Sequence, residues 1–220
     1  MRKAISKQRI FGVPGGRTRQ DRDQDFKSFD KQPRILIVCE GKKTEPNYFK
    51  AFRVTNDVFG KGIETMRVVE EAIRLNREAG PYDQIWCVFD RDDFPPDDFD
   101  NAIKKVESLA KEGFRVAYSN QSFELWYVLH FENLESDLHR SQYIDRLNIH
   151  LGQKYNKSDS NLYDLLKQKG NEKLALRYAD SLREKHKEET SFSKRGPETT
   201  VDLLVKELRQ IQRRRIGISL

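Results

Sequence analysis

The chain has 220 residues, 36% of them hydrophobic and 35% charged, with a formal net charge of +6. This length predicts one large domain or one domain with a small addition, and we expect neither a membrane-spanning helix, which needs roughly 18 consecutive apolar residues, nor a secretory signal. The two cysteines, Cys39 and Cys87, lie far apart in apolar runs, which excludes a disulfide scaffold and a zinc cluster and favours buried thiols in a reducing cytoplasm.

The N-terminal part of the sequence predicts a flexible arm followed by a buried strand. Residues 1–32 carry scattered Arg and Lys and a Gly- and Pro-rich piece without an apolar period, so we predict a basic, flexible arm. Residues 35–39 form the short continuous apolar run of a strand buried on both faces. Thr44 as N-cap and Pro46 in the first turn then predict the start of a helix.

Further helices and strands alternate after this point. Apolar residues at helical spacing predict a helix over 63–79, and residues 85–89 predict a second buried strand. Asp97 and Asp98 open another helix, which we expect to end at Gly113.

A third strand is predicted over 114–118. Asn120 and Ser122 are placed to cap a short, very apolar helix over 123–129. Because strands and helices alternate, we predict βαβ units, which build a parallel sheet flanked by helices, the α/β class.

Beyond residue 132 the pattern is helical only. Pro197 is expected at the first position of the last helix. The helical segments lie near 139–149, 160–169, 171–188 and 198–213. We therefore predict a flexible arm over 1–32, an α/β core over 33–132 and a basic helical C-terminal region over 133–220.

The positive charge is concentrated in the flanks of the chain. Residues 1–34 carry a net +6 and residues 133–220 a net +5, whereas residues 35–132 carry a net −5. One interpretation is chance on a highly charged, solvated surface. The other is that the flanks bind a polyanion while the acidic middle binds metal ions.

Acidic side chains follow each predicted strand. Glu40 follows the first strand, Asp90 and Asp92 the second, and Glu124 comes shortly after the third. Because the carboxyl ends of parallel strands meet at one edge of a sheet, where ligands bind, we expect these carboxylates to converge. Oxygen-rich clusters of this kind suit Mg²⁺ or Mn²⁺ together with a substrate phosphate.

Other motifs in this region either have an explanation that needs no ligand or do not match the known motif that they resemble. Turn and helix-cap chemistry explains Asp97 and Asp98. Residues 41–44 resemble the end of a P-loop, but Leu36 stands where its first glycine should be. The aspartate pair after the second strand resembles the nucleophile motif of haloacid-dehalogenase phosphatases, which belongs on the first strand.

A buried strand ending in Glu-Gly is followed later by a strand ending in Asp-x-Asp. This order resembles the Toprim signature of primases, topoisomerases and OLD-type nucleases. Three ordered blocks of sequence are more specific. They are VCEGKKTEPNYF over 38–49, FDRD over 89–92, and SNQSFELW over 119–126 with LHF over 129–131, with weaker support in GPETT over 196–200. Together these blocks resemble the RloB-like family.

This resemblance implies a Toprim-like sheet and a nuclease that acts in phage defence by abortive infection, often beside an ATPase subunit. By resemblance, Glu40 matches the Toprim glutamate, and Asp90 with Asp92 matches the metal-binding pair. Glu45 and Glu124 match acidic positions that complete a two-metal site. Both also lie at predicted helix starts, where a carboxylate interacts favourably with the helix dipole.

Four basic residues are candidate phosphate ligands. Lys42 and Lys43 lie beside Glu40 at a loop-to-helix junction, where they could neutralise charge on a phosphate. An equally good interpretation is that both are ordinary solvated lysines on the surface. Lys194 and Arg195 precede a predicted helix N-terminus, which favours anions.

The resulting hypothesis is hydrolysis of DNA or RNA phosphodiesters with one or two Mg²⁺ or Mn²⁺ ions. Glu40, Asp90 and Asp92 are its expected catalytic residues. The alternative is a non-catalytic Toprim-like module that docks on a partner ATPase or on nucleic acid. A primase or topoisomerase is disfavoured, because the chain is short and has no zinc ribbon.

Overall fold

The computed structural model describes residues 32–54, 56–92 and 95–215. The basic arm predicted over 1–32 therefore lies outside the described residues, apart from Gln32. In the part of the chain that is described, no helix is long and apolar enough to cross a membrane.

A four-stranded parallel sheet with the strand order β2-β1-β3-β4 forms the framework. The predicted α/β fold with a parallel sheet is confirmed, and the three predicted strands are present to within one residue. The edge strand β2 was not predicted, because Asn, Asp and Gly, which strands disfavour, make up three of its five residues. The strands are β1 (Ile35–Cys39), β2 (Asn56–Gly60), β3 (Gln84–Asp90) and β4 (Phe114–Ser119).

Helices connect the strands and then make up the C-terminal region. The first group consists of α2 (Thr44–Lys50), α3 (Thr65–Ala79), α4 (Pro96–Ser108), the 3₁₀ turn η1 (Ala110–Glu112) and α5 (Glu124–Val128). The four helices predicted beyond residue 132 are confirmed, with ends shifted by up to three residues. They are α6 (Arg140–Leu151), α7 (Leu162–Lys169), α8 (Glu172–His186) and, after the 3₁₀ turn η2 (Phe192–Lys194), α9 (Val201–Arg215).

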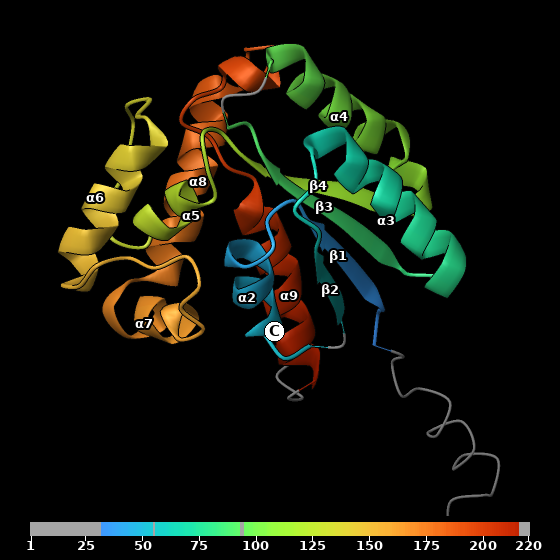
Figure 1. Cartoon of the computed structure of the whole chain (residues 1–220), viewed down its shortest axis with the longest axis horizontal. Coiled ribbons are helices and arrows are strands. Elements are labelled where there is room, and N and C mark those ends of the chain that lie inside the picture. Colours follow the sequence, from blue (N-terminus) through green and yellow to red (C-terminus); the bar gives the residue numbers. More distant parts are fainter. Residues whose placement is uncertain (1–31, 55, 93–94, 216–220) are drawn as a thin grey trace, which may run out of the picture. The chain divides into compact units, whose positions relative to one another are not determined.

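Alternate residues of the central strands face two separate cores, as the pleat requires. Leu36 and Val38 of β1 pack with α3 and α4, whereas Ile37 and Cys39 pack with α2, α5 and the C-terminal helices. Figure 1 shows α3 and α4 on one side of the sheet and α2 and α9 on the other. Cys39 and Cys87 are both buried and unbridged, as predicted.

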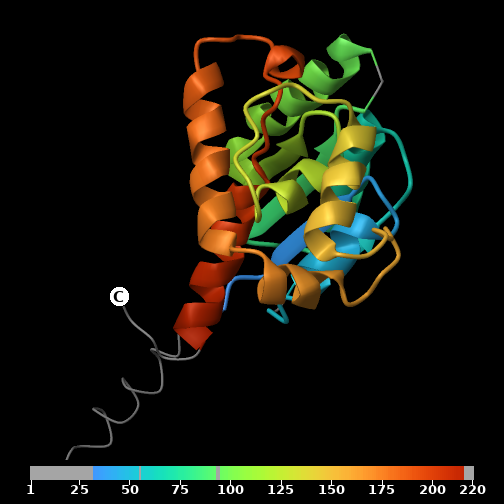
Figure 2. The same cartoon turned by 90° about the vertical axis from the view of Figure 1, so that its left-hand side faces the viewer.

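The C-terminal helices share the larger core with the sheet. Leu147 of α6, Leu166 of α7, Leu182 of α8 and Leu208 of α9 all belong to the cluster that contains Ile37. Figure 2, seen from the side of these helices, shows α6 and α8 on either side of the short α5. Residues on both sides of the predicted boundary at 132 therefore pack together.

Two predicted helix caps are wrong. Thr44 is the first residue of α2 rather than its cap, and Lys43 at the cap position makes no capping bond. Neither Asn120 nor Ser122 caps α5, whose N-cap residue is Phe123. The Asn120 side-chain amide instead donates to two carbonyl oxygens of the segment before α9, because that segment lies against the end of β4.

The predicted start of the last helix at Pro197 is also wrong, because α9 begins at Val201. The segment before it extends the sheet: Thr199 forms an isolated antiparallel bridge with Ser119. The Thr200 amide donates to the Tyr118 carbonyl oxygen at 2.9 Å. Backbone groups at the end of the edge strand β4 thereby find partners, which a helical turn in this segment would not provide.

Candidate active site

Five carboxylates line one cavity of about 360 Å³ at the carboxyl end of the sheet. They come from the loop after β1, the first turn of α2, the end of β3 with the turn that follows, and the start of α5. The structure thus brings together all five acidic residues singled out in the sequence, which are Glu40, Glu45, Asp90, Asp92 and Glu124.

Three of these carboxylates accept hydrogen bonds from backbone amides of the loops at this edge. Glu40 Oε2 accepts from the Asp90 amide at 3.1 Å, and Asp90 Oδ2 accepts from the Phe123 amide at 2.9 Å. Glu45 Oε1 accepts from the Gly41 amide at 3.1 Å. Because these bonds link the ends of β1 and β3 to the start of α5, the three sequence blocks are fixed relative to one another.

Gly41 lies in close contact with the Glu45 side chain. A Cβ atom at position 41 would lie only 2.3 Å from Oε2 of the Glu45 carboxylate. A larger residue here would therefore displace that carboxylate, which is 5% exposed. Glycine at position 41 therefore leaves the Glu45 carboxylate in its place in the cavity.

Burial and like charge disfavour ionisation of these groups. Burial raises the pKa of Glu40 to about 7, and the Asp92 and Glu45 carboxylates add to this increase. Burial also raises the pKa of Asp90 well above its usual range, with the Glu45 carboxylate acting in the same direction. The pKa of Glu45 is raised by burial and by the Glu124 carboxylate. Without a neutralising cation, this arrangement is electrostatically unfavourable.

Two basic residues from the C-terminal region already neutralise part of the site. Arg140 Nη1 lies 2.6 Å from Asp92 Oδ1, and Lys157 Nζ lies 3.8 Å from Glu124 Oε1. The Tyr155 hydroxyl donates to the same Glu124 oxygen at 2.9 Å. Sequence reasoning did not find these residues, because no motif or spacing relates the start of α6, or the loop after it, to the strand ends.

Lys42 and Lys43 line the cavity as well. The Lys43 ammonium donates to Ser158 Oγ at 3.1 Å, so it connects the start of α2 with the loop between α6 and α7. Both lysines therefore lie next to the carboxylates.

Lys194 and Arg195 do not line this cavity. The Arg195 guanidinium lies 3.8 Å from Glu198 and donates to the Glu189 carbonyl oxygen at 2.8 Å. The helix N-terminus that was predicted directly after these two residues is not formed there, because α9 begins only at Val201.

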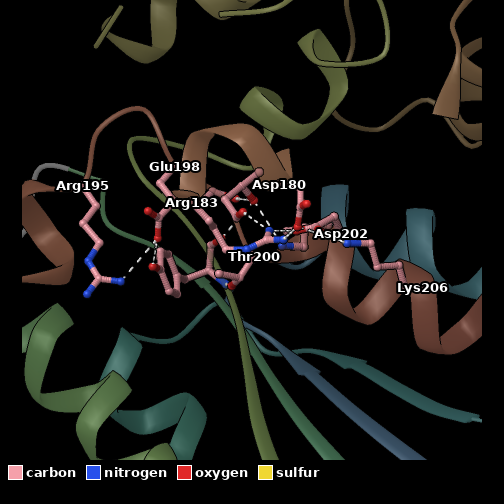
Figure 3. A network of polar contacts seen from close by, with 11 residues as sticks. Asp180, Arg183, Arg195, Glu198, Thr200, Asp202 and Lys206 are labelled. Carbon is pink, nitrogen blue, oxygen red and sulfur yellow. Dashed lines mark hydrogen bonds and ion pairs between the residues drawn. The ribbon is translucent and has the colours of Figure 1, made fainter. Parts of the chain in front are cut away.

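Arg195 belongs instead to a network of ion pairs around the segment before α9. Figure 3 shows Arg195 directed at Glu198, and Arg183 and Lys206 both directed at Asp202. Asp202 is fully buried. The network therefore compensates a buried charge in the C-terminal region.

The cavity fits a hard divalent cation by the chemistry of its donors. All five acidic groups offer carboxylate oxygens, the ligands of Mg²⁺ and Mn²⁺. Among the described residues, Asp90 Oδ1 is buried without a hydrogen-bond partner. As these side chains stand in the described part of the chain, no three His, Cys, Asp or Glu residues form a ready metal-binding group, and Asp92 is paired with Arg140.

Comparison with known proteins gives one match. A family model described as RloB-like protein matches residues 35–208, from the first residue of β1 into α9. The match includes all five carboxylates and the helical region that carries Arg140 and Lys157. No curated protein and no solved structure matches the chain significantly.

Proposed function

The chain belongs to the RloB-like family, and from this membership and the carboxylate cavity we propose that it is a Mg²⁺- or Mn²⁺-dependent nuclease. It would hydrolyse phosphodiester bonds of DNA or RNA in the cytoplasm, in phage defence by abortive infection, with an ATPase subunit as its partner. The resemblance of its three sequence blocks to Toprim-type nuclease subunits supports these roles. The observation that carries the proposal is the convergence of five carboxylates from three chain segments beside two lysines.

Glu40, Asp90 and Asp92 are the residues that would hold the ion or ions, with Glu45 and Glu124 completing the oxygen ligands. When bound, such an ion polarises the phosphoryl group and lowers the pKa of a bound water. Asp90 is the central ligand in this proposal, because among the five carboxylates that line the cavity it alone has a buried oxygen, Oδ1, without a hydrogen-bond partner.

The chain's own groups position these ligands and balance the charge of the substrate. The Asp90 and Phe123 amides hold the carboxylates of Glu40 and Asp90 before any substrate arrives, so little reorganisation is needed. In this proposal Glu40, which lines the cavity, also accepts the proton of the attacking water. Lys42 and Lys43 balance the negative charge that develops on the phosphate.

A second candidate function is a non-catalytic module that docks on an ATPase or on nucleic acid. The ion pairs of Arg140 with Asp92 and of Lys157 with Glu124 favour it, because they neutralise carboxylates without a metal. Such a module needs no divalent ion. In such a module, loss of Asp92 would therefore not change the effect of metal on thermal stability.

A cleavage assay tests the proposed function. The full chain is incubated with plasmid, single-stranded DNA and structured RNA in Mg²⁺, Mn²⁺ or EDTA, with and without the partner ATPase. We expect divalent-dependent cleavage that falls by about 100-fold or more in Asp90→Asn, as when preorganised electrostatic groups are removed from active sites. Asp98→Asn, at an exposed residue in the first turn of α4, is the matched control and keeps activity. Equal inactivity of wild type and Asp90→Asn under every condition would refute the enzyme.

A further inference from the structure

We propose that a cationic groove beside the carboxylate cavity binds the phosphodiester backbone of the nucleic acid on which the protein acts. The inference rests on the proposed function and adds the surface along which the substrate lies. The groove has a volume of about 950 Å³ and is formed by the end of α2, the start of α7 and the end of α9. We call it the cationic groove, after the basic residues that line it, Lys50, Arg53, Lys167, Arg209 and Arg215.

The charge of this groove is strongly one-sided. Its five basic residues face a single lining carboxylate, Asp164. Arg209 is paired with Glu172 through two contacts of 2.6 and 2.8 Å, and the four other basic residues are exposed. A concave surface with this excess of positive charge attracts a polyanion.

A cavity of similar volume, about 970 Å³, lies beside α8 and differs in this respect. Its lining carries five basic residues and four carboxylates. Ion pairs such as those of Lys187 with Glu184 and of Arg195 with Glu198 neutralise it internally. The two cavities therefore have similar volumes, but only the cationic groove has a large excess of positive charge, which is the property that a polyanion site needs.

The cationic groove and the carboxylate cavity share their two walls. Along α2, Thr44 lines the cavity and Asn47 lines the groove, which places them about 4.5 Å apart along the helix axis. In the segment before α7, Ser158 lines the cavity and Ser160 lines the groove. The Lys43–Ser158 hydrogen bond joins these walls at the cavity end. A strand whose phosphate lies at the carboxylates therefore continues directly into the groove.

The neutral lining of the groove suits backbone contacts rather than base reading. Asn47, Ser160 and Asn161 offer amide and hydroxyl groups of the kind that bind phosphates and sugars. Contacts of this type fix the register of a strand without reading its sequence. The groove thus predicts binding that depends on salt and is tolerant of sequence.

Binding is measured separately from cleavage, on the full chain carrying Asp90→Asn, in EDTA. Fluorescence anisotropy follows labelled single-stranded DNA, single-stranded RNA and duplex DNA, because all three present the same phosphodiester chemistry. Lys50→Glu with Lys167→Glu reverses two exposed charges of the groove. The matched control, Lys104→Glu with Lys105→Glu, makes the same change on the exposed face of α4, across the sheet.

We expect the groove variant to lose about tenfold or more in affinity for at least one probe, and its log–log salt slope to fall by about 1 per lysine. The control pair should change affinity less than twofold. Equal losses in both pairs, no loss in the groove pair, or no binding by the parent chain would each overturn the inference. Groove-dependent binding by a protein that never cleaves would sustain it while the proposed function fails.

Discussion

The backbone amide of Phe123 donates a 2.9 Å hydrogen bond to Oδ2 of Asp90, and so ties the carboxylate at the end of β3 to the residue that precedes α5. The other oxygen of Asp90, Oδ1, is buried and lacks a hydrogen-bond partner in the described part of the chain. One oxygen of the carboxylate is therefore held by a hydrogen bond, whereas the other has neither a donor nor a cation among the described residues to stabilise its negative charge.

Asp90→Asn should stabilise the metal-free protein. The amide keeps the acceptor for Phe123 and removes a buried acidic group from a cluster of carboxylates, so we expect the melting temperature in EDTA to rise by about 2–4 °C, equivalent to about 1 kcal/mol. We expect Mn²⁺ to raise the melting temperature of the wild type and to leave that of the variant unchanged. Calorimetry in EDTA and in Mn²⁺ measures both. An unchanged response to Mn²⁺ in the variant would contradict Asp90 as a ligand.

Gly41→Ala should weaken metal binding through Glu45. The new methyl group would lie 2.3 Å from Glu45 Oε2 and so displaces the carboxylate, and we expect affinity for Mn²⁺ to fall by about tenfold, the loss typical of disturbed ligand support. Isothermal titration measures this loss. In a double-mutant cycle with Glu45→Gln the two losses should not add, because they act on the same carboxylate. Full additivity would show that Gly41 acts by another route.

Arg140→Gln should tighten divalent-ion binding. The Arg140 guanidinium, 2.6 Å from Asp92, competes with an incoming ion for the same oxygen, so its removal should lower the Mn²⁺ dissociation constant severalfold. Arg146→Gln is the matched control, since Arg146 lies on the same helix and makes a 2.6 Å ion pair with Glu132, which does not line the cavity. Weaker binding in Arg140→Gln, or an equal change in the control, would contradict the competition.

His130 should make the fold sensitive to mild acid. Burial lowers the pKa of His130 to about 4, whereas an unfolded histidine titrates near 6.5. The unfolded state therefore binds this proton more readily below pH 6.5, and stability falls as the pH decreases toward 4, by up to about 3 kcal/mol at 1.36 kcal/mol per pH unit. The free energy of unfolding, measured in urea, should depend less steeply on pH in His130→Gln than in the wild type. The difference in slope should correspond to up to one proton taken up on unfolding over this pH range. Identical slopes would rule out His130 as the source.

Arg183→Met should destabilise the C-terminal region. Arg183 donates to Asp202, a fully buried carboxylate that also pairs with Lys206 at 2.9 Å. Leaving this charge without its guanidinium should cost about 3 kcal/mol in urea unfolding, and adding Asp202→Asn should recover part of the loss. Lys185→Met, at a half-exposed residue of the same helix, should change stability by less than about 0.5 kcal/mol. Equal effects of the two single variants would contradict the assignment.

The central strands could be predicted because their whole environment is apolar. Residues 35–39 are buried on both faces, so their sequence is a continuous apolar run, and the same reasoning places the carboxylates that follow them at one edge. Strand β2 could not be predicted in this way, because it has no continuous apolar run. It pairs on one side only, and its main-chain hydrogen bonds to β1 suffice without a recognisable pattern of side chains.

The cations of the site could not be predicted, because tertiary packing alone brings them there. Arg140 reaches Asp92 only because α6 packs against α5. The inference for Lys194 and Arg195 depended on where a helix begins, and local pattern is least reliable at such boundaries. Pairing of Thr199 with the end of β4 moved that boundary by several residues.

The packing of α9 against the sheet has a consequence for synthesis. Ile37, in the first strand, and Leu208, in the last described helix, belong to one core although almost the whole described chain separates them. Contacts this distant in sequence form late and slowly. The ribosome must therefore synthesise α9 before β1 can be fully buried. The larger core, and with it the support of the elements around the carboxylate cavity, is therefore complete only after nearly the whole described chain has been synthesised.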